Sequence, residues 1–263
     1  MMKTDLVVKH IVSWLKDYAQ KSKTQGFVIG VSGGIDSAVT STLCAKTGLR
    51  TLCLEMPIHQ DLSQVTRAQK HIQDLKMQFA NVSSLKVDLT HTFEEFKAAL
   101  PKIPESDQKS LSLANTRARF RMTTLYYFAA LHGYLVAGTG NKVEDFGVGF
   151  YTKYGDGGVD LSPIADLMKS EVYEIAAFLG ITEEIQKAAP TDGLFGDSRT
   201  DEDQLGASYD ELEWAMKQDE SPIKTDLDDR QHQVLEIYRN LNKKNQHKMN
   251  PIPVCEIPNV MRD

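Results

Sequence analysis

The stretch Val28-Ile-Gly-Val-Ser-Gly-Gly-Ile-Asp-Ser-Ala-Val39 decides the fold of this chain. Its first half has the β-branched residues of a buried strand, and its second half continues directly into a helical pattern. Gly33 and Gly34 allow the backbone to turn tightly and to approach an anion. The unpaired N–H groups at the start of the helix favour negative charge. The stretch therefore predicts a strand, a phosphate-binding loop and a helix in direct succession.

The residues of this loop distinguish it from the common nucleotide-binding loops. It has neither the lysine of the GxxxxGK[ST] loop nor the glycine spacing of GxGxxG. In their place are two hydroxyls, Ser32 and Ser37, and one carboxylate, Asp36. A carboxylate repels phosphate unless a cation lies between them, and Mg²⁺ prefers oxygen ligands. The loop thus indicates a site for pyrophosphate with Mg²⁺; the alternative is a glycine turn in an α/β protein that binds no ligand there.

Composition is typical of an enzyme of the cell interior. The 263 residues carry a formal net charge of −6, and no basic tract offsets it, so general nucleic-acid binding is not expected. Cys44, Cys53 and Cys255 lack the CxxC spacing of a metal or redox site, which favours buried free thiols. No apolar run is long enough to span a membrane, and the first residues lack the apolar core of a signal peptide. We expect a cytoplasmic protein that contacts neither membranes nor nucleic acid.

Strand-like and helix-like segments alternate along the chain, which is typical of a parallel sheet with helices on both faces. The fold class that we predict is therefore α/β, a doubly wound parallel sheet in a single domain over residues 1–263. In such sheets, ligands bind beyond the carboxyl ends of the strands. We expect helices at residues 6–18, 37–46, 61–79 and 114–132, strands at 27–32, 51–56, 84–88 and 134–138, and a surface connection at 101–113.

A second glycine-rich exit follows the fourth predicted strand, in Gly138-Thr-Gly-Asn-Lys-Val-Glu-Asp-Phe-Gly147. Beside the first loop, it would place Thr139 against phosphates and supply Glu144 as a second carboxylate to the metal. Two carboxylates with phosphate oxygens and waters make an octahedral Mg²⁺ site. The alternative for Glu144 is an acid near a helix N-terminus that interacts only with the helix dipole.

These motifs resemble those of a known superfamily. Ser-Gly-Gly-Ile-Asp-Ser is similar to the signature of the PP-loop ATP pyrophosphatases, which cleave ATP between its α and β phosphates to adenylylate an acceptor. The segment GTGNKVEDFGVGFYTKYGDGGVDLSPIADLMKSEV, at residues 138–172, resembles the NAD synthetases in particular. The resemblance extends through RARFRM at 117–122 to His247-Lys248 and covers nearly the whole chain. It implies an adenine-nucleotide-hydrolase-like fold.

The resemblance also implies roles for individual residues. Asp36 and Glu144 match family positions that hold Mg²⁺, and together with Lys169 they are the residues that we expect to be catalytic. An ammonium group near the triphosphate stabilises the charge that builds on departing pyrophosphate. The implied ATP-binding residues are Gly30, Val31, Ser32, Gly33, Gly34, Ile35, Asp36, Ser37, Thr139, Lys169 and Thr191, and the implied deamido-NAD-binding residues are Arg119, Lys153, Asp160, His247 and Lys248.

Some of these residues also have a plainer interpretation. Arg117, Arg119 and Arg121 are spaced by two, so a helix directs Arg119 away from the other two. We expect only Arg119 to bind ligand, and one or two of the three to be surface charges or ion pairs. On their own, His247 and Lys248 are typical of a solvated basic run in a polar tail.

Three further expectations concern mobility, assembly and departures from the family. Residues 191–206 are a candidate mobile lid, because two glycines flank an aromatic residue and the end is acidic. Relatives are homodimers, which implies a dimer here; the predicted helix at 114–132 either contacts the second subunit or packs on its own sheet. Many relatives have an aspartate and a histidine where this chain has Gly140 and Asn141, so local hydrogen bonds near the metal are expected to differ.

The activity that the resemblance implies is ammonia-dependent formation of NAD. The nicotinate carboxylate of deamido-NAD attacks the α-phosphorus of ATP, pyrophosphate leaves, and ammonia converts the acyl-adenylate to the amide with release of AMP. A chain of this length has no room for a glutaminase domain, so free ammonia is the expected nitrogen donor. The alternatives are amidation of nicotinate mononucleotide, another PP-loop ligase such as a GMP-synthetase or tRNA-modifying enzyme, and a non-catalytic adenine-nucleotide-binding module.

Overall fold

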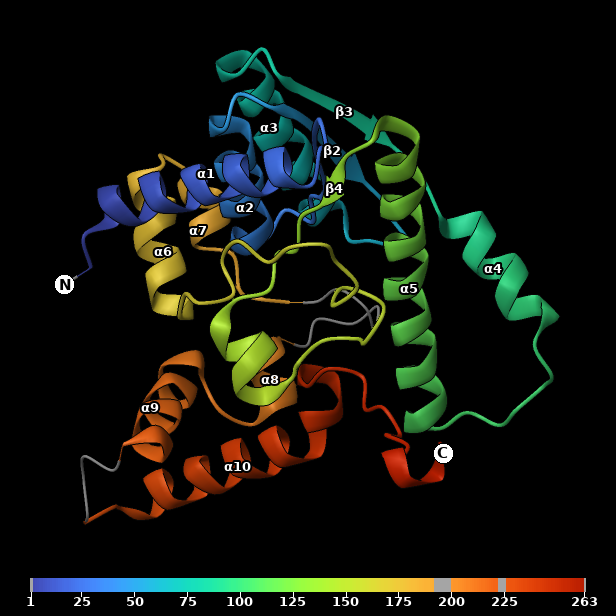
Figure 1. Cartoon of the computed structure of the whole chain (residues 1–263), viewed down its shortest axis with the longest axis vertical. Coiled ribbons are helices and arrows are strands. Elements are labelled where there is room, and N and C mark those ends of the chain that lie inside the picture. Colours follow the sequence, from blue (N-terminus) through green and yellow to red (C-terminus); the bar gives the residue numbers. More distant parts are fainter. Residues whose placement is uncertain (1, 192–199, 222–225, 263) are drawn as a thin grey trace.

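The computed structural model describes residues 2–191, 200–221 and 226–262, and it contains a parallel sheet with helices on both faces (Figure 1). Each pair of neighbouring strands runs parallel, and Phe27 lies opposite both Thr51 and Leu135. The predicted α/β fold class is confirmed. The strands are β1 (Gly26–Gly30), β2 (Arg50–Glu55), β3 (Val82–Lys86) and β4 (Leu135–Val136), in the spatial order β3-β2-β1-β4.

Alternating side chains of β1 explain why both faces of the sheet are covered. Phe27 and Ile29 pack with apolar residues of the first group of helices, whereas Val28 packs on the opposite face with the second group. The first group comprises α1 (Thr4–Lys21), α2 (Ile35–Lys46), α6 (Lys169–Phe178) and α7 (Glu183–Gln186); the second comprises α4 (Thr90–Ala99) and α5 (Asp107–His132). The helix α3 (Leu62–Gln78) packs in a separate cluster with Cys53 of β2 and Val82 of β3.

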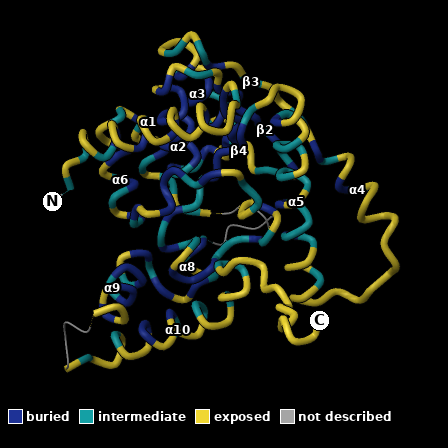
Figure 2. Tube along the Cα trace, viewed as in Figure 1, coloured by how far each residue is buried: buried dark blue, intermediate teal, exposed yellow. Residues whose placement is uncertain are grey.

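The carboxyl-terminal helices form a separate apolar cluster beside the sheet, visible as buried stretches in Figure 2. In this cluster, Val143 and Val148 pack with Leu212 and Val234. The turn that carries Glu144 is therefore held between the sheet and the carboxyl-terminal helices. These elements are the π-helical turn η1 (Val143–Val148), α8 (Asp201–Leu205), α9 (Tyr209–Glu220), α10 (Asp229–Met249) and the short η2 (Asn259–Met261).

The segment between β3 and β4 differs from the sequence-based expectation. The predicted surface connection at 101–113 is wrong over its second half, because α5 begins at Asp107. Ser106 caps this helix by accepting a hydrogen bond from the Lys109 N–H at 3.2 Å. The helix α4 was not predicted. Since Phe93 is its one buried residue, its apolar stripe is too short to show a helical period.

The carboxyl-terminal part differs as well. His247 and Lys248 belong to the last turn of α10, a helix that was not predicted; His247 is exposed and Lys248 is partly buried. Cys44 and Cys53 are buried as predicted, whereas Cys255 is exposed. Among the residues that the structure describes, no helix is both long and apolar enough to cross a membrane.

A buried histidine ties α3 to the helix that follows the phosphate-binding loop. His71 Nε2 lies 2.9 Å from Ser41 Oγ, and this hydroxyl donates to the Ser37 carbonyl at 2.7 Å. Burial lowers the pKa of His71 to about 4, so the ring is neutral in the folded chain near neutral pH. An unfolded chain protonates histidine near pH 6.5 and therefore binds more protons between pH 6.5 and 4. The contribution of this residue to stability consequently falls as the pH falls through that range.

His71 should cost the wild type up to about 3 kcal/mol in free energy of unfolding as the pH falls from 6.5 to 4. We expect His71→Gln, which keeps a side-chain N–H donor, to abolish this loss. Urea unfolding followed by circular dichroism across this range measures the effect. His10→Gln, at an exposed position of α1, is the control and should leave the pH dependence unchanged. Identical pH dependence in wild type and His71→Gln would contradict a neutral, buried ring.

Candidate active site

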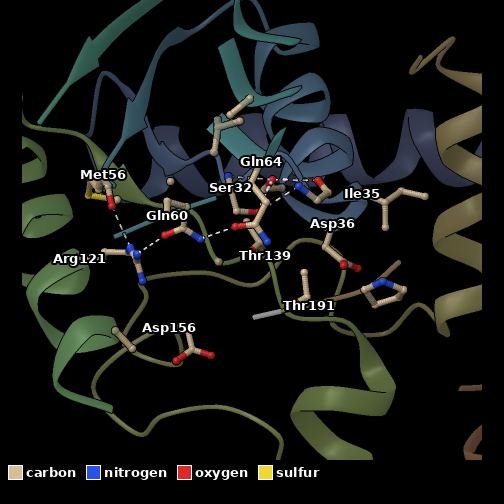
Figure 3. Close-up of a pocket in the computed structure, with 18 of the residues that line it drawn as sticks. Ser32, Ile35, Asp36, Met56, Gln60, Gln64, Arg121, Thr139, Asp156 and Thr191 are labelled. Carbon is tan, nitrogen blue, oxygen red and sulfur yellow. Dashed lines mark hydrogen bonds between the residues drawn. The ribbon is translucent and has the colours of Figure 1, made fainter. Parts of the chain in front are cut away.

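A cavity of about 290 Å³ opens where β1, β2 and β4 end (Figure 3). Its walls come from the loop after β1, the ends of β2 and β4, the middle of α5 and the start of α6. Ligands bind at this position in parallel α/β sheets. The residues predicted for ATP or metal that line it are Gly30, Val31, Ser32, Gly34, Ile35, Asp36, Ser37, Thr139, Glu144, Lys169 and Thr191.

The loop after β1 has a shape that suits an anion. Gly33 has a φ of 84°, and a Cβ at this position would lie 2.5 Å from the Gln64 carbonyl oxygen, so only glycine fits. The Ser37 hydroxyl donates to the Gly34 carbonyl at 2.9 Å, and Ser32 Oγ accepts from the Gly34 N–H at 3.2 Å. Gly34 is the N-cap of α2 and has no side chain to cap it. The first-turn amides of α2 are therefore available to phosphate oxygens.

A buried ammonium group joins the two predicted metal-binding carboxylates. Lys169 Nζ lies 2.7 Å from Asp36 Oδ2 and 3.1 Å from Glu144 Oε1, and its side chain is only 3% exposed. Burial alone would lower the pKa of Lys169, but the charges of Asp36 and then Glu144 outweigh burial and raise it above the ordinary lysine value. The ammonium group is therefore charged and directed into the cavity wall beside both carboxylates.

Asn141 organises the same two carboxylates from a fully buried position. Its amide N–H donates to Asp36 Oδ1 at 3.2 Å, and its amide oxygen accepts from the Glu144 backbone N–H at 3.2 Å. The sequence marked Asn141 as a departure from relatives but gave no role to it. The structure shows that its amide supplies a donor to one carboxylate and fixes the backbone that carries the other.

Tyr209, the first residue of α9, completes the surroundings of Glu144. Its hydroxyl donates to Glu144 Oε1 at 2.6 Å, and its ring face lies 4.6 Å from Lys169 Nζ. Burial, and then the charge of Glu144, raises the pKa of Tyr209, so the phenol keeps its proton and acts as a donor. The sequence segment Ser208-Tyr-Asp210 resembles the family, but no role was predicted for this residue.

The donor set of this site fits a hard divalent cation. Asp36 and Glu144 supply carboxylate oxygens that already converge on one positive charge, and Mg²⁺ binds through one or two carboxylates together with phosphates and water. Among the described residues, no group of three or more histidines, cysteines, aspartates or glutamates gathers to hold a metal. Phosphate oxygens and water would therefore have to complete the coordination sphere.

Four of the five residues predicted to bind deamido-NAD gather near the end of α10, outside the wall of the main cavity. Lys153 donates to the His247 carbonyl, and Arg119 donates to the Lys153 carbonyl at 3.3 Å. Lys248 donates to the Gly149 and Tyr151 carbonyls at 2.7 and 2.8 Å, which ties α10 to the loop after η1.

Asp160, the fifth residue, lies apart from these four. Its carboxylate accepts from the Tyr126 hydroxyl at 3.0 Å and from the Val136 N–H at 2.8 Å. The structure thus gives Asp160 an internal role in fixing the end of β4.

Three residues that sequence reasoning did not assign to a ligand form a hydrogen-bonded chain along the cavity wall (Figure 3). Arg121 donates to the Met56 carbonyl at 3.0 Å and to Gln60 Oε1 at 2.7 Å, and Gln60 donates to Gln64 Oε1 at 2.6 Å. Arg121, rather than Arg119, is the arginine of RARFRM that lines the cavity. The sequence did contain a signal for Gln60, which follows the predicted second strand. In a parallel sheet, the carboxyl end of that strand lies beside the phosphate-binding loop.

The candidate lid at 191–206 is described only in part, since residues 192–199 lie outside the described residues. Thr191 and the buried Asp201 line the cavity. Thr200 begins α8 with a capping box, in which its hydroxyl accepts from the Asp203 N–H at 3.1 Å.

Residues 7–252 match a family model described as NAD synthase. The chain belongs to the NAD synthase family. A curated relative, the NH(3)-dependent NAD(+) synthetase of Carboxydothermus hydrogenoformans, is 34% identical over 244 residues, which are 90% of this chain and 92% of the relative. The family resemblance of the sequence motifs is confirmed.

Two solved structures share the fold of this member of the family. The structure of NMN synthetase from Francisella tularensis has a TM-score of 0.85 and 30% sequence identity, and the match covers 98% of this chain and 100% of that chain. NH3-dependent NAD synthetase from Campylobacter jejuni, in complex with the nitrate ion, has a TM-score of 0.78 and 27% identity, and the match covers 97% and 100%.

The placement of the two arginines yields a prediction. Arg121→Ala should lower kcat/KM for the nucleotide substrates about tenfold or more, because a charge-assisted hydrogen bond contributes about 1.5–3 kcal/mol. The comparison on the same helix is Arg119→Ala, which removes a cation outside the cavity wall, so we expect a smaller loss of kcat/KM than in Arg121→Ala. Steady-state kinetics of both variants measures this difference, and a larger loss in Arg119→Ala would reverse the assignment.

Proposed function

We propose that this chain forms NAD by amidating deamido-NAD with ammonia at the expense of ATP, which makes it a ligase that forms a carbon–nitrogen bond. One observation supports the proposal above the others. A glycine-rich loop, a helix N-terminus and the triad of Asp36, Lys169 and Glu144 meet in one cavity of a chain from the NAD synthase family. The loop is suited to a leaving pyrophosphate, and the triad is suited to the charge that develops on it.

In the first step, an oxygen of the nicotinate carboxylate forms a bond to the α-phosphorus of ATP. The bond between the α-phosphorus and the oxygen that bridges to the β-phosphate breaks. The electron pair leaves with pyrophosphate, which the amides of the first turn of α2 would hold. Lys169 carries a fixed positive charge beside this position, so it stabilises the leaving group without moving a proton.

Asp36 and Glu144 are the residues that would hold Mg²⁺ at this site. When bound, the ion neutralises phosphate charge and orients the triphosphate. Asn141 and Lys169 fix the two carboxylates, so their orientation is set before substrate arrives.

In the second step, the ammonia nitrogen forms a bond to the acyl carbon, the bond from that carbon to the phosphate oxygen breaks, and AMP leaves with the electron pair; the proton lost from nitrogen passes to solvent. This step competes with hydrolysis of the adenylate, so the site must exclude water. Apolar side chains of the cavity wall support this role, and they include Met56, Met122, Leu125, Phe150 and Val159.

The dinucleotide requires a further binding surface, for which we propose Arg121 in the cavity and the basic group formed by Arg119, Lys153, His247 and Lys248. Its support is a pair of hydrogen bonds, from Arg119 to the Lys153 carbonyl and from Lys153 to the His247 carbonyl, which connect the middle of α5 to the end of α10. Cationic side chains suit the pyrophosphate of deamido-NAD.

We further propose a cytoplasmic homodimer. Its support is the carboxyl-terminal half of α5, where Tyr127 and Leu131, one turn apart on the same face, are 63% and 60% exposed. Apolar side chains gathered on one helix face are typical of an interface with another protein surface.

The decisive assay supplies ATP, Mg²⁺ and ammonium with deamido-NAD, nicotinate mononucleotide or xanthylate in turn and follows AMP release. We expect turnover with deamido-NAD and none with xanthylate. The mononucleotide belongs in the assay because the Francisella neighbour is described as NMN synthetase. A higher kcat/KM for the mononucleotide than for deamido-NAD would make the mononucleotide the substrate of this chain. AMP release with xanthylate alone would contradict the family activity.

Substitutions of the two carboxylates test the proposed metal site. Asp36→Asn and Glu144→Gln each keep the side-chain volume but remove a negative charge beside Lys169, so each should lower AMP formation at least a hundredfold. Asp166→Asn is the control, because its carboxylate pairs with Lys142 at an exposed position. Near-normal turnover in Asp36→Asn or Glu144→Gln would remove that residue from the site.

A further inference from the structure

Tyr209 is fixed in place by both backbone and side-chain contacts. It follows Ser208, whose hydroxyl accepts from the Glu211 N–H at 3.3 Å and whose N–H donates to Glu211 Oε2 at 2.9 Å. Its own N–H donates to Glu202 Oε1 at 2.9 Å. The side chain is 5% exposed and packs in the apolar cluster of the carboxyl-terminal helices. The hydroxyl therefore reaches the site from a rigid support.

The contacts of Glu144 are distributed unevenly between its two oxygens. Oε1 accepts from the Tyr209 hydroxyl at 2.6 Å and from Lys169 Nζ at 3.1 Å. Among the described residues, no group donates to Oε2. Two donors on one oxygen lower its capacity to bind a further cation, and they leave the other oxygen as the better ligand.

We propose that Tyr209 is a positioning residue, which occupies Oε1 of Glu144 and directs Oε2 to the metal ion. The proposal rests on the proposed function, since Glu144 is a metal ligand only in that account. Coordination through one oxygen suits Mg²⁺, which takes ligands in octahedral geometry. Partners of metal ligands orient those ligands, and removing such a partner typically weakens metal binding 10–100-fold.

The connection also links two parts of the molecule. Glu144 lies on η1, Lys169 begins α6, and Tyr209 begins α9, and α9 packs against both η1 and α6. The carboxyl-terminal helices thus contribute to the geometry of the metal site through one phenol. A hydroxyl with only a structural role would affect stability and leave the affinity for metal unchanged.

Tyr209→Phe tests the proposal, because it removes one oxygen and retains the ring against Lys169. Binding of Mn²⁺ in the presence of α,β-methylene-ATP, followed by electron paramagnetic resonance, gives the dissociation constant. We expect it to rise about tenfold or more in Tyr209→Phe. Raising Mg²⁺ in the turnover assay should restore most of kcat, since the lost interaction acts on metal occupancy.

Tyr238→Phe is the matched control, because Tyr238 lies buried in the same apolar cluster and, among the described residues, has no hydrogen bond to Asp36 or Glu144. Its dissociation constant should equal that of the wild type. A value for Tyr209→Phe within twofold of the wild type, an equal rise in Tyr238→Phe, or loss of the cooperative thermal transition in Tyr209→Phe would overturn the proposal.

The wild-type titration separates this inference from the proposed function. Absence of Mn²⁺ binding by the wild type would overturn the metal site itself, and the positioning role with it. Equal binding by wild type and Tyr209→Phe would overturn only the role of Tyr209.

Discussion

The ammonium group of Lys169, buried between Asp36 and Glu144, is the interaction on which the site depends. It brings together the start of α2, the turn η1 and the start of α6, which are far apart in the sequence. Removing Lys169 would leave two neighbouring carboxylates without their cation, which is strongly destabilising. The arrangement also sets the chemistry, because two carboxylates and a fixed cation surround the place where phosphate charge must be balanced.

The sheet order explains how these segments meet. Because β1 lies between β2 and β4, the loop after β1 and the exit of β4 leave the same edge of the sheet side by side. The phosphate-binding loop and Glu144 are thereby neighbours. Packing of α6 against α2 then places Lys169 next to Asp36, and the carboxyl-terminal helices support Glu144 from the other side. Each charged residue is thus delivered by a different element of the fold.

Local signals allowed the phosphate-binding loop and the alternation of strands and helices to be predicted from the sequence. Gly33 illustrates why. Its positive φ and the nearby Gln64 carbonyl oxygen both require a residue without a Cβ, and a glycine-rich pattern after a strand indicates such a turn. The start of α5 was missed because a Ser106 cap overrides the weak periodicity of the preceding residues. The sequence spacing of two residues predicted that Arg119 faces away from Arg117 and Arg121. Which face lines the cavity depends on how α5 packs on β1, and this packing places Arg121 in the cavity wall.

The partners of the two carboxylates show the limit of a single sequence. Asn141 and Tyr209 act through hydrogen bonds to Asp36 and Glu144, and such contacts depend on distances between elements rather than on any local pattern. Asp160 has an internal contact that the sequence did not indicate: its carboxylate accepts from the Tyr126 hydroxyl and from the Val136 N–H at the end of β4.

Adenylylation of a carboxylate at this site is tested most directly by an isotope measurement. Deamido-NAD labelled with ¹⁸O in its nicotinate carboxylate is converted in the presence of ATP, Mg²⁺ and ammonium, and the products are analysed by mass spectrometry. Attack of the carboxylate on the α-phosphorus predicts one ¹⁸O atom in AMP and none in pyrophosphate. Label in inorganic phosphate, or AMP without label, would contradict the account.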